Sequence, residues 1–471
     1  MRVVLAGYNV DVNCLNDGNC GVFTPETLAA AYARISRDPS DIPELRLDAI
    51  QDVDAARKSN KAIVFDMGHS SIAEHAVLNF DIMGISRLAV EWLEGFRLAS
   101  FTEKSQRYVS LDHDYVLPKE LVGTPYETRF VELMEEQASA YKIICQHLED
   151  EIRRDGKKVT KKRRSRITED ARYIASLATT TQLGMTVNAR ELELMICRAA
   201  ANPLREIQEL GERLYAISQD IVPSLVRYVE PCDWDKKVMA IPSCAKDLPK
   251  NSNCSESTNV VLIGRDLSTK VRDLFCALLF RISSIPYEDI VRHIWKEDDM
   301  EAWIKEHLRD IKSFHAVPRE WEHVSFTFSI SVSASAYAQL KRHRMSTQTA
   351  QQYMSDRYGI PVSIDKSELN GCVEVAMWNS TMLHDDLIRD GYGKVADYAL
   401  TNAHVRRVLV TMNMREIYHF VRLRSDKHAQ EEIRSVAKNM EDVIKQVSPA
   451  LALLLCGKDV FEEKYADIFS R

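Results

Sequence analysis

An internal repeat is the feature of this sequence that most constrains its fold. The strand-like run RVVLAGYN at 2–9 returns as NVVLIGRD at 259–266, and AEHAVLNFDI at 73–82 returns as WEHVSFTFSI at 321–330. Two more pairs follow in the same order, first EGFRLASFTEKSQRY and KRHRMSTQTAQQYMSDRY, then MTVNARELELMI and VTMNMREIYHFV. Four echoes in one order indicate a diverged tandem duplication.

The repeat sets the expected domain boundaries. We predict a first repeat at 1–230, a linker at 231–258 that is rich in Pro, Ser, Asn and Lys, and a second repeat at 259–471. Alternating apolar residues predict strands, and helical spacing predicts long helices at 126–154, 192–225 and 416–447. Without regular β-α-β alternation, this predicts an α+β fold, with a small, mostly antiparallel sheet packed with long helices in each copy.

Composition limits the partners and the compartment. The 471 residues are 45% hydrophobic and carry a net charge of −7, so no global basic field attracts nucleic acid. No apolar run approaches the roughly 18 residues of a membrane span, and Met1 begins no signal-peptide pattern. We therefore expect a cytoplasmic protein without membrane or nucleic-acid partners. The basic segment 153–166 is read as a solvated connection between two helices, with RNA or another polyanion as the alternative ligand.

The ten cysteines indicate no metal site. Cys232, Cys244 and Cys254 cluster in the middle of the chain, but their spacing lacks the close ligand pairs that zinc sites use. A zinc site there remains an alternative, and reduced thiols are the expectation for a cytoplasmic protein.

Chemistry-bearing residues occupy the echoed positions. In the second half, Arg342, His343 and Arg344 place two guanidinium groups around an imidazole, and Gln339 lies one helical turn earlier. Guanidinium groups suit phosphate and carbonyl oxygens. Adjacent side chains cannot all point the same way, so this cluster can serve two ligands, although a surface basic cluster would look similar.

In the first half, the loop FTEKSQRY presents a carboxylate, a hydroxyl and a guanidinium at alternating positions. An extended backbone would point Glu103, Ser105 and Arg107 to one side, with Lys104 and Gln106 between them. Such a set suits the ribose and phosphate of a nucleotide, although a polar turn would show the same residues.

Together these elements resemble the flavin-dependent thymidylate synthase family. Its signature is RHR, seven residues, then Ser in a Glu-x-Ser-x-Arg loop, preceded by Gly-His and Glu-His. The first half matches with MGHSSIAEH, GISR, FRLASFTEKSQRY and EDARYIASLATTTQLGMTVNARE, and includes His69 and Ser71. The second half matches with EH, QLKRHR and NMREIYHFVRLRSDKHAQEEIR.

Each half also departs from the family pattern. The first half has Trp92, Gly95 and Phe96 where the family has Gln, Arg and His, and Gln208 stands near the position of its closing Arg. At strict spacing, the loop of the second half has Ala350, Gln352 and Met354 for Glu, Ser and Arg. A register slipped by three residues, which would place Ser355 at the Ser position, is the alternative.

The resemblance implies how the halves divide the work, because the family's sites form between the subunits of a homotetramer. It implies that the first half contributes His69, Ser71 and the nucleotide loop Glu103, Lys104, Ser105, Gln106 and Arg107. It assigns to the second half Gln339, Arg342, His343 and Arg344, with Arg407 for a phosphate, Arg424 and His428 for the flavin, and Arg434 for the pyrimidine. We expect a fused pseudo-dimer that pairs into a homodimer, a pseudo-tetramer with two working sites.

The resemblance also implies a reaction. Ser105 and Arg434 are the expected catalytic residues, because a cation near the pyrimidine N3 would stabilise charge as C5 becomes nucleophilic. FAD would be the cofactor, with NADPH and methylenetetrahydrofolate as co-substrates, and dUMP would become dTMP. Two alternatives stay open. One is the same chemistry on another pyrimidine nucleotide, including hydroxymethylation or UMP-type methylation, and the other is a degenerate nucleotide- or flavin-binding protein without activity.

Overall fold

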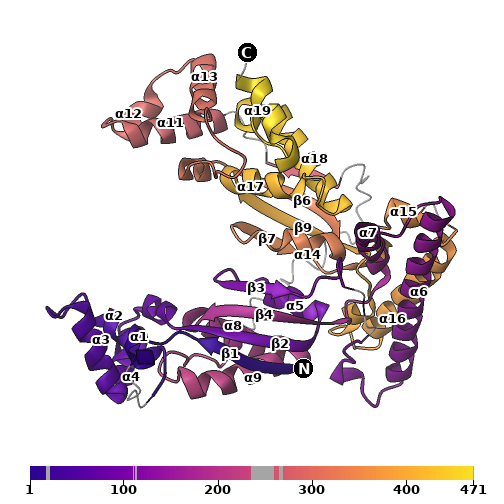
Figure 1. Ribbon diagram of the computed structural model, residues 1–471, viewed down its shortest axis with the longest axis horizontal. Helices are drawn as coiled ribbons and strands as arrows, with labels where there is room; N and C mark the ends of the chain where they lie inside the picture. Colours follow the sequence, from indigo (N-terminus) through magenta and orange to yellow (C-terminus); the bar gives the residue numbers. More distant parts are fainter. Residues whose placement is uncertain are drawn as a thin grey trace. The chain divides into compact units, whose positions relative to one another are not determined.

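The computed structural model describes residues 1–16, 22–109, 111, 114–234, 259–264, 269–365 and 368–469. The chain forms two compact units (Figure 1). Unit 1 contains 1–252 together with 363–401, and unit 2 contains 253–362 together with 402–471. A segment of the second repeat thus belongs to the unit that is built mostly from the first repeat.

The first repeat carries a four-stranded antiparallel sheet of order β1-β2-β4-β3. Along the central strand β2, Leu78, Phe80 and Ile82 alternate toward the core with less buried residues, as the period-2 pattern predicts. Helices α8 and α9 pack on the sheet (Figure 1). The bounds are β1 (Arg2–Tyr8), β2 (Val77–Ser86), β3 (Ala99–Glu103), β4 (Thr180–Asn188), α8 (Ala189–Ala200) and α9 (Arg205–Ile221).

The second repeat carries the corresponding antiparallel sheet of order β5-β6-β9-β7, and β8 also pairs with β9. Helices α17 and α18 contribute to its core. The predicted α+β class with antiparallel sheets is confirmed. The bounds are β5 (Val260–Ile263), β6 (Ser325–Ser333), β7 (Ser346–Ala350), β8 (Met354–Tyr358), β9 (His404–Asn413), α17 (Met414–Arg424) and α18 (Glu431–Val447).

Both repeats anchor the end of their second strand in the same way. The Ser86 backbone N–H and hydroxyl donate to the Glu206 carboxylate, both at 2.7 Å. Correspondingly, the Ser333 N–H donates to Glu432 at 2.7 Å, and its hydroxyl bonds the same carboxylate. Each serine oxygen also caps the following helix. These helices are α5 (Arg87–Leu93) and α14 (Ala334–Leu340).

Two of the predicted long helices were wrong in extent. Residues 192–225 form most of α8 and α9 with a break around Pro203, which has no N–H for a helix and disfavours helical geometry in the residue before it. Residues 416–447 divide between α17 and α18, because the Gln430 side chain accepts from the Ile433 N–H at 3.1 Å and begins a new helix there.

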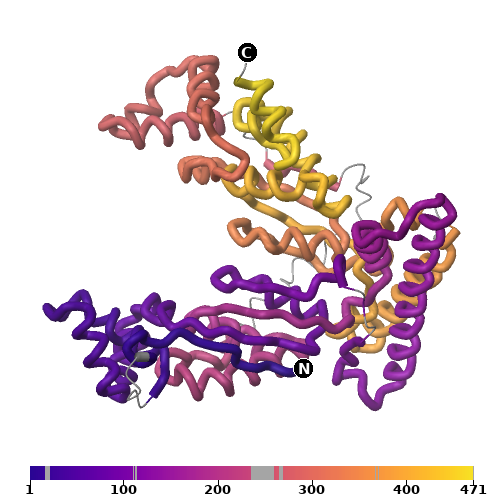
Figure 2. Tube along the Cα trace, in the orientation of Figure 1, coloured from indigo at the N-terminus to yellow at the C-terminus, as the bar shows by residue number. Residues whose placement is uncertain are grey.

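The third predicted long helix has the predicted bounds, and it pairs with a helix from the other repeat. Helix α6 (Tyr126–Arg154) runs beside α16 (Asn370–Arg389) within unit 1 (Figure 2). Phe130 and Leu383 share their apolar contact, and Gln137 Nε2 donates to Ser380 Oγ at 2.8 Å. This contact holds the segment 363–401 in unit 1.

Equivalent positions of the two repeats also pair directly. Ser176 forms an isolated antiparallel bridge with Thr401, and each lies twelve residues before the Asn that caps the next helix, Asn188 or Asn413. Pairing between equivalent positions is what a twofold axis produces in a symmetric dimer. At this point the chain pairs with itself at equivalent positions of its two repeats.

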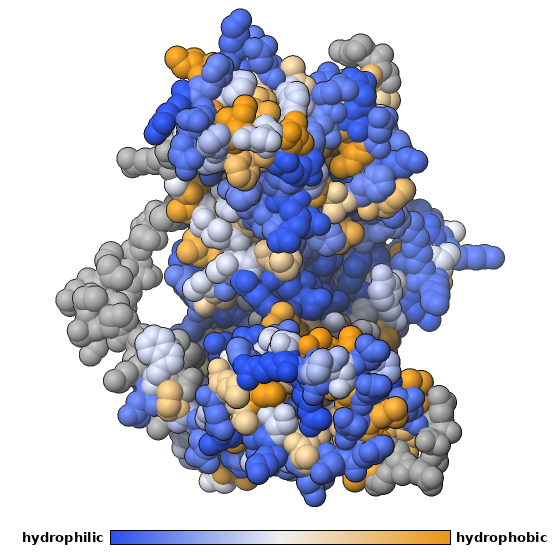
Figure 3. All heavy atoms as spheres, turned by 90° about the vertical axis from the view of Figure 1, so that its left-hand side faces the viewer, coloured by the Kyte–Doolittle hydropathy of each residue, from blue (hydrophilic) through white to orange (hydrophobic). Residues whose placement is uncertain are grey.

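The remaining helices complete the two units. They are α1 (Val12–Asn16), α2 (Glu26–Arg34), α3 (Ile42–Gln51), α4 (Val53–Lys61), α7 (Lys161–Ala171), α11 (Lys270–Ile282), α12 (Tyr287–Arg292), α13 (Glu297–His307), α15 (Val362–Asp365) and α19 (Phe461–Phe469). Among the described residues, no helix is long and apolar enough to cross a membrane. The face in Figure 3 is mostly hydrophilic, with hydrophobic side chains in scattered patches.

The cysteines follow the expectation only in part. Cys14 is disulfide-bonded, so the expected reduced state is wrong at that residue. Cys232 is an exposed thiol outside any disulfide, whereas Cys244 and Cys254 lie outside the described residues. Within the described ranges, no group of three or more His, Cys, Asp or Glu side chains is placed to hold a metal.

Candidate functional site

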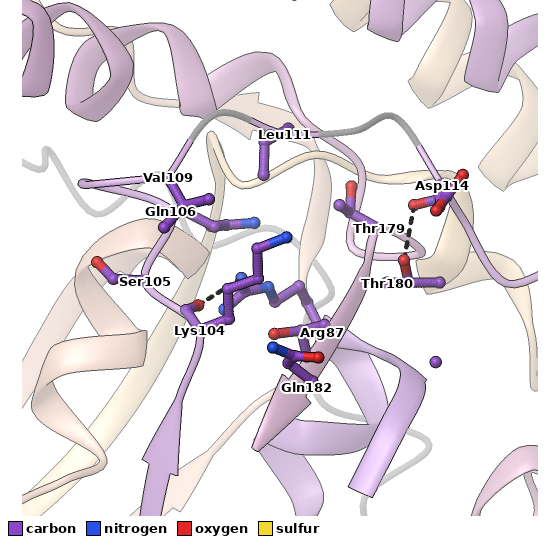
Figure 4. A pocket seen from close by; sticks show the side chains of 12 residues that line it. Arg87, Lys104, Ser105, Gln106, Val109, Leu111, Asp114, Thr179, Thr180 and Gln182 are labelled. Carbon is purple, nitrogen blue, oxygen red and sulfur yellow. Dashed lines mark hydrogen bonds between the residues drawn. The ribbon is translucent and has the colours of Figure 1, made fainter. Parts of the chain in front are cut away.

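A polar pocket lies beside the loop that follows β3. Its volume is about 260 Å³, and its wall comes from that loop, from the start of β4 and from the junction of β2 and α5 (Figure 4). In Figure 4 the Lys104 ammonium group points into the pocket, near Gln106, Arg87 and Gln182. The lining residues are Gly84, Arg87, Lys104, Ser105, Gln106, Val109, Leu111, Asp114, Thr179, Thr180, Thr181 and Gln182.

Arg87 organises the base of this pocket. Its guanidinium forms an ion pair with Glu103 and donates to the Lys104 carbonyl at 2.9 Å. The Glu103 side chain is almost fully buried, so its negative charge is stabilised by the Arg87 guanidinium rather than by solvent. Arg87 and Glu103 thereby fix the backbone from which the Lys104 side chain extends.

The next residues of the loop are anchored on α7. The Ser105 hydroxyl accepts from the Arg107 N–H at 3.2 Å, and in Figure 4 it points away from the other lining side chains. The Arg107 guanidinium pairs with Glu169, and its carbonyl accepts from Thr168 Oγ1 at 2.7 Å. The loop is thus built by its own polar side chains, and Ser105 lies at the rim of the pocket.

Arg172 is a functional candidate that the sequence reasoning did not single out. It is 5% exposed, and burial lowers the pKa of its guanidinium. The like charges of Arg107 and Arg87 lower this pKa further. The Glu169 carboxylate opposes this shift, so Arg172 belongs to a cluster of three arginines and one glutamate beside the loop. A signal was present in the sequence, because Arg172 lies sixteen residues before Asn188 and the same position of the second repeat is acidic.

The second repeat holds a row of hydrogen-bonded side chains, Glu416, His343 and Arg424, which we call the buried polar chain. The His343 Nδ1 bonds Glu416 at 2.9 Å, and its Nε2 accepts from Arg424 Nε at 3.1 Å. Because the guanidinium can only donate, the imidazole carries its proton on Nδ1. Arg424 also donates to the Gln339 carbonyl at 3.2 Å. His343 is 4% exposed, and burial lowers its pKa, so it is neutral and positions Arg424.

The other cations of this motif face outward. Arg342 and Arg344 are exposed on either side of the buried His343, so the three residues point alternately, as expected. Arg407 is half-buried on β9, opposite Ser331 of β6.

A cavity of about 430 Å³ lies next to the polar chain in unit 2. Its wall is mostly apolar, with a few polar groups between the apolar side chains, which is typical of cofactor pockets. Arg415 lines it and is held by Glu322 at 2.7 Å. The lining includes Phe314, His315, Val317, Met345, Asn413, Arg415, Glu416, Tyr418, His419 and Leu423.

Two predicted site residues of the second repeat lie elsewhere. Arg434, on α18, donates to the Lys427 carbonyl at 3.4 Å and lines a different cavity with Lys438. The His428 side chain is 73% exposed and pairs with Asp426 at 2.7 Å. Neither residue lines the cavity beside His343.

His69 and Ser71 belong to the matching region of the first repeat. Both are exposed, and the neighbouring Gly68 and Ser70 line a cavity of about 230 Å³. Arg190 lines this cavity and pairs with Glu74 at 2.6 Å, as Arg415 pairs with Glu322 in the second repeat.

The first repeat has no counterpart of the buried polar chain among its described residues. Trp92 and Phe96 occupy the places of Gln339 and His343, and their rings pack edge to face with centroids 5.1 Å apart. Glu191, the counterpart of Glu416, accepts instead from the Leu98 N–H at 3.3 Å. Apolar packing has therefore replaced the polar cluster in this repeat.

The second repeat likewise fills the place of the nucleotide loop. Arg406 lies over the rings of Tyr353 and Tyr337, 4.2 and 5.0 Å from their centroids, and donates to the Gln351 carbonyl at 2.8 Å. Ala350 pairs with Val408 as Glu103 pairs with Leu183. The register is therefore the strict one, with Gln352 at the position of Ser105, whereas Ser355 lies on β8.

Comparisons with known proteins agree with this pair of related units. The family model "Thymidylate synthase complementing protein" matches residues 22–224 and 269–450. A flavin-dependent thymidylate synthase from Clostridium tetani is 31% identical over 238 residues, which covers 49% of this chain and 86% of the relative. A UPF0159 protein from Thermoplasma acidophilum is 25% identical over 435 residues, with 83% and 87% covered. The solved UMP/dUMP methylase from Streptomyces cacaoi matches 42% of this chain and 95% of its own, at 21% identity and a TM-score of 0.34, too low for a structural argument.

The chain is thus a duplicated α+β protein that has a polar loop pocket in one repeat and a buried cluster of Arg424, His343 and Glu416 in the other. The chain is a member of the flavin-dependent thymidylate synthase family. Membership supports an enzyme that uses a flavin and methylates a pyrimidine nucleotide.

Proposed function

We propose that this chain transfers a one-carbon unit to C5 of dUMP and reduces it to the methyl group of dTMP. Methylenetetrahydrofolate supplies the carbon, and NADPH supplies the hydride that a bound FAD relays, so that tetrahydrofolate and NADP⁺ are the other products. The observation that carries the proposal is complementary retention. One repeat keeps the polar loop pocket, and the other keeps the Gln339, His343 and Arg424 cluster.

The loop pocket of the first repeat suits the nucleotide phosphate. Arg87 and Lys104 line it, Arg172 is buried nearby, and the hydroxyls of Thr179 and Thr181 add neutral donors. Charge-assisted bonds from such donors to a phosphate are among the stronger hydrogen bonds in proteins.

The cavity beside His343 suits the flavin. Aromatic and aliphatic walls can pack against rings, while Asn413, Arg415 and His419 offer polar groups for an adenosine or a diphosphate. When bound, a reduced flavin supplies the hydride chemistry. The protein residues would fix the position of the rings and exclude water.

Arg424 is better placed than Arg434 to activate the pyrimidine. Its guanidinium is fixed by His343 and by the Gln339 carbonyl, so little reorganisation is needed when negative charge develops on the ring. Gln339 Oε1 is buried and accepts no hydrogen bond within the described parts of the chain. A pyrimidine N3–H would be a suitable donor for it.

We further propose that the chain works as a homodimer, a pseudo-tetramer with two functional sites. Each repeat has filled one half of the ancestral site with its own side chains, Trp92 and Phe96 in the first and Arg406 in the second. The remaining halves are complementary. The Ser176–Thr401 pairing within one chain is consistent with descent from a symmetric dimer.

The visible spectrum and product analysis of the protein test this function. Protein reconstituted with FAD should bleach anaerobically with NADPH, and adding dUMP and methylenetetrahydrofolate should reoxidise it and yield dTMP by mass spectrometry. If the protein bleaches and forms a methylated product from UMP but not from dUMP, its substrate is another pyrimidine nucleotide than the one proposed. A protein that cannot be loaded with FAD would refute the proposal and favour a degenerate binding protein.

A further inference from the structure

A strongly basic segment precedes and begins α7, the helix on which the loop after β3 is anchored. Residues 153–166 contain nine Lys or Arg residues and one Asp in a chain whose net charge is −7. The side chains of Lys158, Lys161, Lys162 and Arg164 are exposed at the end of α6, in the turn and at the start of α7. We call residues 157–166 the basic surface.

The fold uses part of this charge, because Lys157 pairs with Asp155 at 2.9 Å and Arg164 pairs with Glu149 at 3.2 Å. The cations at the start of α7 are less favourable for the helix itself. The first turn of α7 contains no acidic residue, although acidic side chains favour helix N-termini and cations oppose the helix dipole there. Lys162 and Arg166 lie four residues apart, where like charges destabilise a helix. The helix is begun instead by the Thr160 hydroxyl, which accepts from the Arg163 N–H at 3.3 Å. Cations that oppose the helix dipole at the start of α7 favour a role in binding an anion.

Helix α7 links this surface mechanically to the candidate site. Ser165 Oγ and Thr168 Oγ1 donate to the Arg107 carbonyl at 3.0 and 2.7 Å, and Glu169 pairs with the Arg107 guanidinium. Lys161 lies only four residues before Ser165, about 6 Å along the helix axis. An anion held by the basic surface is therefore brought close to the loop pocket.

We propose that the basic surface binds an extended polycarboxylate, the γ-linked oligoglutamate tail of the folate co-substrate. This inference rests on the proposed function, which requires a folate at the site. Several exposed ammonium groups in succession match several carboxylates along a flexible chain, whereas the single phosphate of the nucleotide has its own pocket. RNA is disfavoured because residues 153–166 include no aromatic side chain on which a base could stack.

A direct binding measurement tests the inference without turnover. The probe is fluorescein-labelled tetra-γ-glutamate, and the variant is the triple substitution of Lys158, Lys161 and Lys162 to Gln. The matched control substitutes the exposed Lys58, Lys61 and Lys142 to Gln, which changes the net charge equally on α4 and α6. We expect the variant to raise the Kd for the probe about tenfold at low salt, because each exposed ion pair contributes modestly, and the control to leave it within about twofold.

Equal binding by the variant and the control would overturn the inference. So would a labelled RNA oligomer that binds more tightly than the tetraglutamate and is lost in the same variant. In the turnover assay, the variant should raise KM for tetraglutamyl methylenetetrahydrofolate and leave KM for the monoglutamyl form unchanged. Absence of dTMP with either folate contradicts the proposed function, whereas dTMP with unchanged KM for the tetraglutamyl form contradicts only this inference.

Discussion

Replacing His343 with Phe tests whether the buried polar chain holds Arg424. Phe is the residue of the first repeat at this position, so the ring is retained while both hydrogen bonds are lost. The substitution leaves the Glu416 carboxylate, 7% exposed, without its imidazole donor. Hydrogen bonds to charged groups contribute about 1.5–3 kcal/mol each. Arg424 is half-buried and can bind water instead, so we expect a loss of about 3 kcal/mol in the free energy of unfolding.

Urea denaturation of the apoprotein, followed by tryptophan fluorescence and circular dichroism, measures this loss. His428→Phe is the matched control, because the side chain of His428 is exposed and should change stability by less than about 0.5 kcal/mol. His343→Gln, which keeps a donor and an acceptor, should fall between the two. If His343→Phe unfolds within about 0.5 kcal/mol of the unmodified protein, the buried chain does not bear on stability and the argument for a fixed Arg424 fails.

Three further predictions concern the site and its pH dependence. Ser105→Ala should abolish dTMP formation, whereas Gln352→Ala should leave it nearly unchanged. Initial rates with dUMP measure both effects, and equal losses would contradict the assignment of the working loop to the first repeat. Arg424→Ala should lower kcat by at least about a hundredfold, as expected when a charge-stabilising donor is lost, whereas Arg434→Ala should not, and the reverse order would restore Arg434 as the activating cation. Burial lowers the pKa of His384, but the hydrogen bonds that its ring donates to the Asp397 and Asp385 carboxylates raise it overall. The stability that this residue contributes is therefore present below pH 6.5 and lost as pH rises through the raised value. A His384→Gln variant whose unfolding midpoint shows the same pH slope in this range would refute this prediction.

Local patterns predicted the elements of the fold but not their assembly. The period-2 alternation around Phe80 is a property of a few adjacent residues, and it placed the strands. Pro203 also stands in the sequence, but the apolar spacing on both sides of it favoured one continuous helix, whereas the structure has two helices, α8 and α9. By contrast, the assignment of α16 to unit 1 depends on contacts such as Gln137 with Ser380, between residues far apart in the chain. Such contacts leave no periodic signal in one sequence.

The same distinction holds for the site. The RHR run and the Glu-x-Ser-x-Arg loop are short motifs, so sequence spacing found them. Arg172 was missed because its importance comes from burial beside Arg87 and Arg107. The acidic residue at the equivalent position of the second repeat marks a difference between the repeats but does not reveal that burial. Arg424 and Arg434 lie ten residues apart with similar chemistry, and only the hydrogen bond from Arg424 to His343 separates their roles.

The way in which each repeat lost half of its site follows from the energetics of buried polar groups. A buried donor or acceptor without its partner costs about 1–3 kcal/mol, so a site that no longer binds its ligand is destabilising until it is filled. The first repeat filled it with the apolar contact of Trp92 and Phe96, and the second with Arg406 between two tyrosine rings. Each filling stabilises one repeat and also prevents its half from regaining the ligand. Under the proposed division of the site, neither repeat acts without the other, and selection would maintain the fusion as one enzyme.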